Sequence, residues 1–266
     1  MARSPGETAP LAGVGILVTR PAHQSEPLCR RIEAAGGCAI RFPVLEILDP
    51  ADPGPLLSVI ERIEEFDLAI FISSNAVTRT LNRLPGRRPL PPTLRIAAIG
   101  RGSAKELARA GVPADIVPAP PFNSEALLAT EAMQAVAGRR IVIFRGDGGR
   151  ELLGDELRRR GARVEYAEAY RRARPDADVG RVLRHWVRGE LQIVTVTSSE
   201  GLRNLFELTG RLGRQWLCRT PLVTVSERTA ALARELGCRE SVTVAREASD
   251  EALVAAVGEW VRRRHD

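Results

Sequence analysis

Short runs of aliphatic and β-branched residues alternate with amphipathic stretches along most of the chain. The run Ile16–Val18 is followed by a polar turn and then by apolar positions at helical spacing as far as Gly36. Similar successions of an apolar run, a turn with Gly, Ser or Thr, and a helical stretch start near Ala69, Ile141 and Val194. Apolar runs of this length indicate buried strands, and the periodic stretches indicate helices. The pattern therefore predicts repeated strand–helix–strand units.

These units form an internal repeat. Arg20 aligns with Arg145 at an offset of 125 residues, and the serine pair at 73–74 aligns with the pair at 198–199 at the same offset. A third pair of segments matches at an offset of 126 residues. Matching segments at a fixed offset indicate a chain built from two similar halves.

Strands that alternate with helices predict parallel sheets covered by helices on both faces. We therefore predict an α/β fold with two doubly wound parallel-sheet domains, which suits a length of 266 residues. Proline-bearing linkers are expected around 42–55 and 168–178. A cut at these linkers makes 50–168 an inserted domain within a discontinuous domain of 1–45 plus 176–266. A cut near Ala137 would instead give two contiguous halves, and the pattern alone allows both.

Composition and charge reduce the number of functions that the chain could have. The chain is 44% hydrophobic and 27% charged, which is typical of globular proteins. No apolar stretch approaches the roughly 20 residues of a membrane span, and the start of the chain has no signal-peptide pattern, so we expect a cytoplasmic protein without membrane contact. The net charge of +6 suits a polyanionic partner, but the arginines are spread along helices, so we expect no nucleic-acid partner.

Metal and cofactor chemistry find no support in the sequence. The four cysteines form no CxxC pair, so we expect buried thiols and no metal site. The three histidines form no recognisable triad. The glycine-rich run 145–151 lacks both the GxGxxG spacing and a Walker lysine, and a tight turn is the simpler interpretation. We therefore expect no cofactor.

A set of motifs occurs in a fixed order from Ile16 to Val244. They are VTRP at 18–21, FISSN at 71–75, AIG at 98–100 with Ser103, RGDGGRE at 145–151, YRR at 170–172, TSS at 197–199, and Ser226 with Thr229. Each motif alone is common among α/β proteins. The ordered set resembles the uroporphyrinogen-III synthase family.

The resemblance implies both a fold and an activity. The fold of that family, two flavodoxin-like α/β domains joined by a two-stranded linker, selects the cut with the inserted domain. The implied activity is that of a lyase in haem biosynthesis, which cyclises hydroxymethylbilane to uroporphyrinogen III with inversion of ring D and loss of water. The resemblance also implies a monomer.

The predicted site follows from strand topology and from the chemistry of this substrate. Ligands of open parallel sheets bind beyond the carboxyl ends of the strands, where backbone amides and helix N-termini suit carboxylates. Acetate and propionate groups on every pyrrole would spread over a large surface, such as a cleft between two domains. The predicted substrate-binding residues are Thr19, Arg20, Ser73, Ser74, Asn75, Gly100, Ser103, Arg145, Gly146, Ser198, Ser199, Ser226 and Thr229. For the serines, helix N-capping is the alternative role.

Tyr170 is the predicted catalytic residue, because it matches a tyrosine of the family. Its hydroxyl would act as a general acid when hydroxide leaves the substrate. Packing within the linker is its alternative role. Most of the reactivity belongs to the substrate, and the protein mainly has to hold the ends of the linear tetrapyrrole together.

Two other function classes fit parts of the sequence. One is a cytoplasmic two-domain binding module for an acidic small molecule, since fold alone does not define function. The other is an enzyme of nucleotides or sugar phosphates that uses the glycine turn at 146–149. Turnover distinguishes the synthase from the binding module, and tight nucleotide binding would favour the second alternative.

Overall fold

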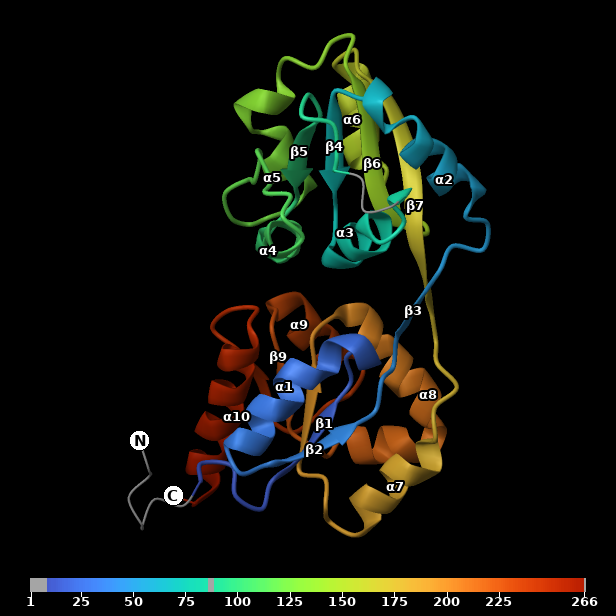
Figure 1. The fold of residues 1–266 in the computed structure, drawn as a ribbon. Helices are drawn as coiled ribbons and strands as arrows, with labels where there is room; N and C mark the ends of the chain where they lie inside the picture. The colour runs from blue at the N-terminus through green and yellow to red at the C-terminus, as the bar shows by residue number, and fades with distance from the viewer. Residues whose placement is uncertain (1–8, 86–88, 266) are drawn as a thin grey trace. The chain divides into compact units, whose positions relative to one another are not determined.

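The computed structural model describes residues 9–85 and 89–265. The chain divides into two compact units. Unit 1 comprises Met1–Glu46 and Ala173–Asp266, and unit 2 comprises Ile47–Arg172. Figure 1 shows a sheet with helices in each unit.

Unit 1 contains a parallel sheet with the strand order β10-β9-β8-β1-β2. Its strands are β1 (Gly15–Val18), β2 (Cys38–Arg41), β8 (Ile193–Val196), β9 (Leu222–Thr224) and β10 (Val242–Val244). Its helices are α1 (Ala22–Ala34), α7 (Val179–Val187), α8 (Ser199–Leu217), α9 (Glu227–Glu235) and α10 (Asp250–His265). The helix α8 is broken at Gly210, whose φ of 61° is left-handed.

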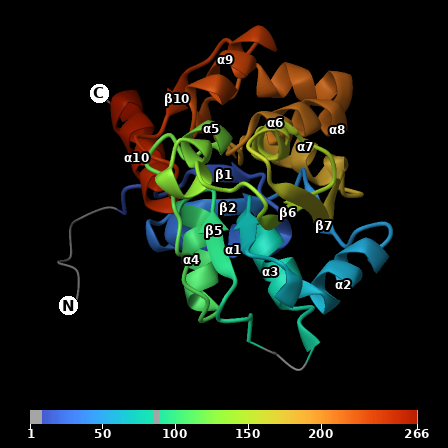
Figure 2. The same cartoon turned by 90° about the horizontal axis from the view of Figure 1, so that it is seen from above.

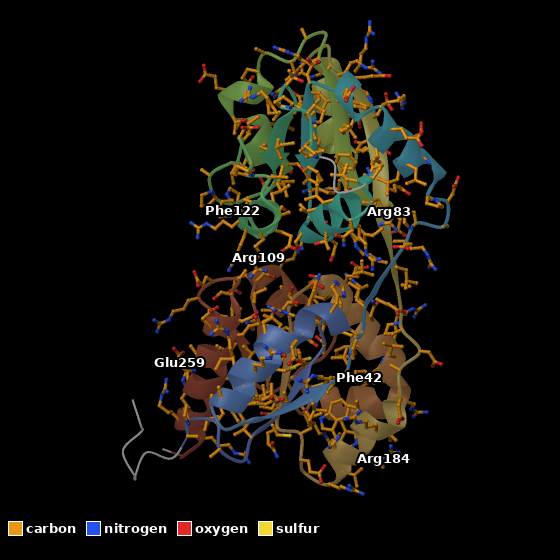
Figure 3. All side chains as sticks on the ribbon, viewed as in Figure 1. Phe42, Arg83, Arg109, Phe122, Arg184 and Glu259 are labelled. Atoms are coloured by element: carbon orange, nitrogen blue, oxygen red, sulfur yellow. The ribbon has the colours of Figure 1, made fainter. Side chains whose placement is uncertain are left out.

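Both faces of this sheet are buried, as expected for a doubly wound fold. Leu17 faces the core formed by α7, α8 and α9, which also contains Phe42 (Figure 3). The neighbouring Ile16 and Val18 face the core formed by α1 and α10. These two helices lie side by side (Figures 1 and 2). Side chains alternate between the two faces of a strand, so a continuous apolar run serves both layers.

Unit 2 contains a second sheet, with the order β3-β7-β6-β4-β5. Its strands are β3 (Glu46–Leu48), β4 (Leu68–Phe71), β5 (Arg95–Ala98), β6 (Arg140–Gly146) and β7 (Arg163–Ala173). Its helical segments are α2 (Gly54–Glu61), η1 (Ile63–Glu65), α3 (Ser74–Leu81), α4 (Arg101–Arg109), α5 (Ser124–Leu128), η3 (Glu131–Met133) and α6 (Leu152–Arg159). The pairs β4–β5, β4–β6 and β6–β7 are parallel.

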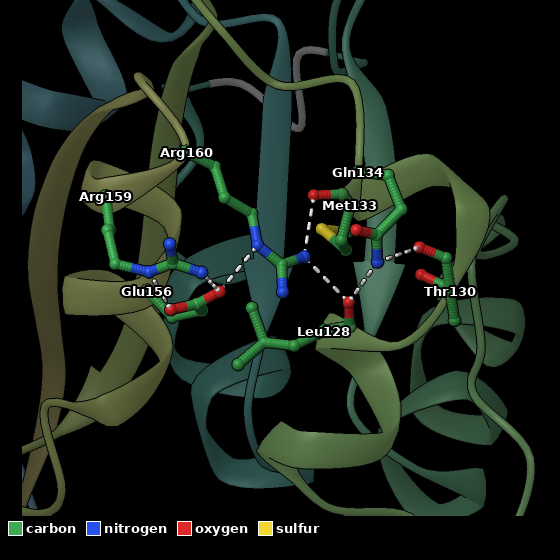
Figure 4. Close-up of polar contacts among 7 residues, drawn as sticks. All are labelled: Leu128, Thr130, Met133, Gln134, Glu156, Arg159 and Arg160. Carbon is green, nitrogen blue, oxygen red and sulfur yellow. Dashed lines mark hydrogen bonds and ion pairs between the residues drawn. The ribbon is translucent and has the colours of Figure 1, made fainter.

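Alternation also builds the core of unit 2. Ile70 and Ile143 face the cluster formed with α5, η3 and α6. Phe71 and Phe144 are fully buried, and their rings stack with centroids 4.9 Å apart. Arg160, directly after α6, donates hydrogen bonds to the carbonyl oxygens of Leu128 and Met133 and thereby joins α6 to the α5–η3 segment (Figure 4).

The internal repeat is visible in the strand order of both sheets. Repeat-equivalent strands make β9-β8-β1-β2 in unit 1 correspond to β5-β4-β6-β7 in unit 2. Each unit combines one strand–helix–strand segment from each half of the chain. A cut near Ala137 would separate β4 from β6, which are hydrogen-bonded neighbours.

Candidate active site

In unit 2, β4 leads directly into α3 through Ser73. The backbone of Ser73 is extended (φ −160°, ψ 157°), and its Oγ accepts a hydrogen bond of 3.1 Å from the amide of Ala76. Ser73 is therefore the N-cap of α3, and Ser74 and Asn75 form the first turn. The first amides of a helix have no intrahelical acceptor, so this turn presents donors beyond the strand end.

The Ser73 hydroxyl also lies 3.1 Å from the hydroxyl of Tyr170. Tyr170 is 2% exposed and belongs to β7. The register between β6 and β7 shifts after Arg145, so that Gly146 pairs with Tyr170. Such a bulge redirects side chains at the end of a strand. Ser73, Tyr170 and Gly146 therefore lie together at the carboxyl edge of the sheet.

The turn after β6 holds the backbone of the Tyr170 segment. The amide of Asp147 donates to the Tyr170 carbonyl oxygen at 2.8 Å, and the Asp147 carboxylate accepts from the amide of Arg172 at 3.0 Å. Gly148 and Gly149 adopt positive φ values of 62° and 108°. Sequence reasoning assigned no role to Asp147. An aspartate directly before two glycines is the signal of such a side-chain-to-backbone turn.

The guanidinium of Arg145 is turned into the protein. The residue is 5% exposed, its Nε donates to the Gly146 carbonyl oxygen at 3.3 Å, and its guanidinium lies 4.5 Å from the centre of the Tyr166 ring. Arg145 thus supports the β6–β7 edge in this structure.

Gly100 and Ser103 lie at the start of α4, after β5. Gly100 is the N-cap, and a Cβ atom at this position would lie 3.3 Å from the Cβ of Phe122. Arg101 stacks on the Phe122 ring at 5.1 Å (Figure 3 labels Phe122). Ser103 is 4% exposed. The close approach of Phe122 to this turn was not predicted, because it requires the chain to return from more than twenty positions away.

In unit 1, three hydroxyl groups form a chain across the ends of β8 and β9. Ser199 Oγ lies 3.3 Å from Thr229 Oγ1, and Ser226 Oγ lies 3.0 Å from the same atom. Thr229 is fully buried. Ser198 and Ser226 are the N-caps of α8 and α9 and accept from the amides of Gly201 and Thr229.

The two predicted substrate-binding residues after β1 both interact with other residues of unit 1. Thr19 is 4% exposed and donates to the carbonyl oxygen of Thr195 at 2.8 Å, which ties β1 to β8. Arg20 forms an ion pair with Asp250, the first residue of α10. Asp250 was not predicted, although its place after Ser249 is typical of a helix start.

The four cysteines are free thiols, and among the described residues they belong to no group of metal ligands. Within residues 9–85 and 89–265, no group of three or more His, Cys, Asp or Glu side chains is placed to hold a metal ion. Cys29 and Cys238 are buried, and burial raises the Cys238 pKa to about 11. The expectation of four buried thiols is wrong for Cys38, which is exposed on the short strand β2. None of the described helices is long and apolar enough to cross a bilayer.

Comparison with known proteins identifies the family. Residues 26–255 match the family described as Uroporphyrinogen-III synthase HemD. The chain is 37% identical over 246 residues to the uroporphyrinogen-III synthase of Salmonella typhimurium, covering 92% of this chain and 100% of that protein. It is 33% identical over 261 residues to the synthase of Synechococcus elongatus, covering 96% and 98%. The chain belongs to the uroporphyrinogen-III synthase family.

Solved structures of uroporphyrinogen-III synthases share the fold. The enzyme of Thermus thermophilus, in a mutant form, matches with a TM-score of 0.59 at 19% identity, over 95% of this chain and 99% of that one. The enzyme of Helicobacter pylori matches with a TM-score of 0.58 at 16% identity, over 93% and 99%. The predicted α/β fold with two parallel-sheet domains is confirmed.

Membership of the uroporphyrinogen-III synthase family decides among the function classes. The chain is a hydro-lyase of tetrapyrrole biosynthesis, as the ordered motifs predicted. The binding-module and nucleotide alternatives are therefore not retained.

Proposed function

We propose that the chain cyclises hydroxymethylbilane to uroporphyrinogen III in the cytoplasm, as a monomer, and that Tyr170 is its general acid. Family membership supports the reaction. The hydrogen-bonded pair of Tyr170 and Ser73 at a strand end supports the assignment of the acid.

The substrate carboxylates would bind at helix N-termini, which lie beyond the carboxyl ends of the strands in each of the two sheets. The first turns of α3 and α4 in unit 2, and of α8 and α9 in unit 1, present amides and hydroxyls. A charge-assisted hydrogen bond contributes about 1.5–3 kcal/mol. Several such bonds would hold the acetate and propionate groups of the substrate. The N-capping serines would then both stabilise the starts of the helices and lie beside the bound carboxylates.

The proposed first step breaks the carbon–oxygen bond of the hydroxymethyl group. Tyr170 donates a proton to the departing hydroxyl, which leaves as water, and the pyrrole N–H loses a proton to give a neutral azafulvene. The pyrrole proton replaces the one that Tyr170 gave up, so the step loses water overall. Attack by the substituted carbon of ring D, rearrangement and closure then follow from the reactivity of the substrate.

Ser73 and Gly146 position the acid. The Ser73 hydroxyl fixes the Tyr170 hydroxyl at 3.1 Å, and Gly146 leaves room for the ring. A buried acid in one orientation needs little reorganisation when the bond breaks, which is the benefit of a preorganised site.

The variant Tyr170→Phe tests this proposal. We expect it to form uroporphyrinogen III about 100-fold more slowly, because a positioned general acid contributes about 10²–10⁴-fold. Spontaneous closure would then give more of the type I isomer. The rate and isomer ratio are measured by oxidising the products and separating the porphyrins chromatographically.

Tyr166→Phe is the matched control. Tyr166 also lies on β7, and its hydroxyl donates to the Glu151 carbonyl oxygen at 3.2 Å. The substitution removes one hydroxyl and keeps the ring under Arg145, so the rate should stay near that of the unmodified chain. A Tyr170→Phe protein with normal stability and an undiminished rate would exclude Tyr170 as the acid.

A further inference from the structure

A cavity of about 720 Å³ lies in unit 1 at the amino ends of its strands. It is lined by the turns that lead into β8, β9 and β10. Parts of α7, α8 and α10, which Figure 1 labels, complete the lining. The proposed substrate-binding turns follow the carboxyl ends of the same strands. The cavity is therefore on the opposite edge of the sheet and goes beyond the proposed function. Its volume is within the range of small-molecule pockets, about 300–1,000 Å³.

All three tryptophans of the chain line this cavity. They come from three different helices: Trp186 from α7, Trp216 from α8 and Trp260 from α10. Trp216 and Trp260 are half-buried, so their rings are partly open to a ligand. Indole rings provide wide flat surfaces for stacking of another aromatic ring.

The wall that carries Trp186 is held rigidly. Trp186 is 3% exposed, and its indole N–H donates to Thr220 Oγ1 at 3.0 Å. Thr220 Oγ1 in turn donates to the carbonyl oxygen of Trp216 at 2.8 Å. These two bonds couple the ends of α7 and α8 at the cavity, and a preformed wall lowers the entropic cost of binding.

The charge of the lining is predominantly positive. Three arginines, Arg219, Arg263 and Arg264, line the cavity against a single carboxylate, that of Glu240. Among the described residues, no ion pair engages Arg219, which is exposed. The guanidinium of Arg264 lies 5.5 Å from the centre of the Trp260 ring. Guanidinium groups bind carboxylate and phosphate oxygens in a planar, bidentate manner.

We propose that this cavity binds a planar aromatic anion, that is, a conjugated ring system that carries carboxylate or phosphate groups. The indole rings of Trp216 and Trp260 stack on the ligand, and Arg219 and Arg264 bind its acidic groups. A polycarboxylate porphyrin and a nucleotide are two sources of this chemistry.

Tryptophan fluorescence of the full-length protein reports on the cavity directly, because every tryptophan of the chain lines it. Uroporphyrin III and ATP are the two probes, titrated separately. We expect a saturable change with at least one of them. A change with the porphyrin alone identifies a polycarboxylate site, and a change with ATP alone identifies a nucleotide site.

A porphyrin bound at the catalytic edge would also quench tryptophan, so variants of the cavity decide the assignment. Arg219→Ala and Arg264→Ala should each weaken binding about tenfold, since one charged hydrogen bond is worth at least that factor. Both variants should retain the rate of uroporphyrinogen III formation. Arg211→Ala removes the same charge from an exposed position of α8 outside the lining and should bind like the unmodified chain.

Two results would overturn the proposal. One is the absence of any saturable change with either probe. The other is a change that Arg219→Ala, Arg264→Ala and Arg211→Ala all leave at the affinity of the unmodified chain.

Discussion

At Gly146 the backbone passes close to the ring of the proposed acid. A Cβ atom at this position would lie 2.6 Å from two ring carbons of Tyr170. Carbon atoms in van der Waals contact are about 3.5–4.0 Å apart, so the ring would have to move. We expect Gly146→Ala to lower the rate of uroporphyrinogen III formation strongly, because the Tyr170 hydroxyl would leave Ser73. Steady-state assays of product formation measure this effect.

Gly258→Ala is the control for this substitution. Gly258 lies within α10, and the nearest atom to its added methyl is the flexible end of Arg262, at 3.7 Å. Alanine is favoured over glycine within helices, so the variant should gain about 0.5–1 kcal/mol of stability at unchanged activity. Full activity of Gly146→Ala would show that the position of the Tyr170 ring is not critical.

For individual residues, the sequence predicted which ones belong to the candidate site better than it predicted their contacts. Ser73 and Tyr170 were both chosen from motifs, but their hydrogen bond joins positions 97 residues apart. The ion pair of Arg20 with Asp250 spans 230 positions. Such contacts depend on which strands are neighbours and which helix packs over them, and a local pattern does not contain this information.

Arg160 stabilises unit 2 by linking two of its secondary-structure elements. It binds Glu156 of α6 and the carbonyl oxygens of Leu128 and Met133 in the α5–η3 segment (Figure 4). The side chain is 19% exposed, so its partners would be left partly buried without a donor. Arg160→Met should lower the free energy of unfolding of unit 2 by about 1–3 kcal/mol.

Urea unfolding followed by two signals measures this change. Circular dichroism reports on both units, whereas tryptophan fluorescence reports on unit 1, which contains all three tryptophans. The circular dichroism transition should begin at lower urea, with the fluorescence transition unchanged. Arg159→Met is the matched control: this neighbour also pairs with Glu156 but is 74% exposed, so its effect should stay within about 0.5 kcal/mol. Equal effects of both variants would contradict the role of Arg160.

The periodicity of apolar residues was enough to predict that the strands and helices exist. It was not enough to predict their irregularities. The repeated runs gave the strands, and Ser73 and Ser198 cap equivalent helices as N-cap propensity suggests. The bulge between β6 and β7 and the break of α8 at Gly210 were not predicted. The bulge depends on how two neighbouring strands pair, whereas the break occurs at a glycine, the residue type that most readily adopts a left-handed φ.

Acid should destabilise unit 2, because three carboxyl groups of this unit have pKa values lowered by their partners. A hydrogen bond from the Arg140 amide, with Arg139 nearby, lowers the pKa of Asp67, and Arg83 together with Arg79 lowers that of Asp49. Arg159 and Arg160 lower the Glu156 pKa to about 2. A carboxyl group with a lower pKa in the folded state adds stability above its unfolded pKa and loses it as pH falls through the folded value.

The midpoint of urea unfolding should therefore be nearly constant from about pH 7 to pH 5 and should fall between about pH 4 and pH 2. Added salt should reduce the change, because it screens exposed ion pairs. A midpoint that does not fall below about pH 4 would show that these pairs do not stabilise the fold.

The domain architecture shows why a repeat in the sequence does not give domain boundaries directly. The repeat halves meet near Ala137, yet the structure pairs β4 from one half with β6 from the other. Likewise β1 pairs with β8 across the repeat boundary. Similar segments have similar strand propensities, so hydrophobic pattern alone does not specify which copy pairs with which.

Closure of a linear tetrapyrrole with inversion of one ring is the reaction that we propose for the whole molecule. The most direct test supplies the purified protein with hydroxymethylbilane generated in the same vessel, oxidises the products and separates the uroporphyrin isomers chromatographically. We expect uroporphyrin III to dominate and its share to rise with protein concentration. Formation of uroporphyrin I alone, as in the absence of protein, would contradict this proposal.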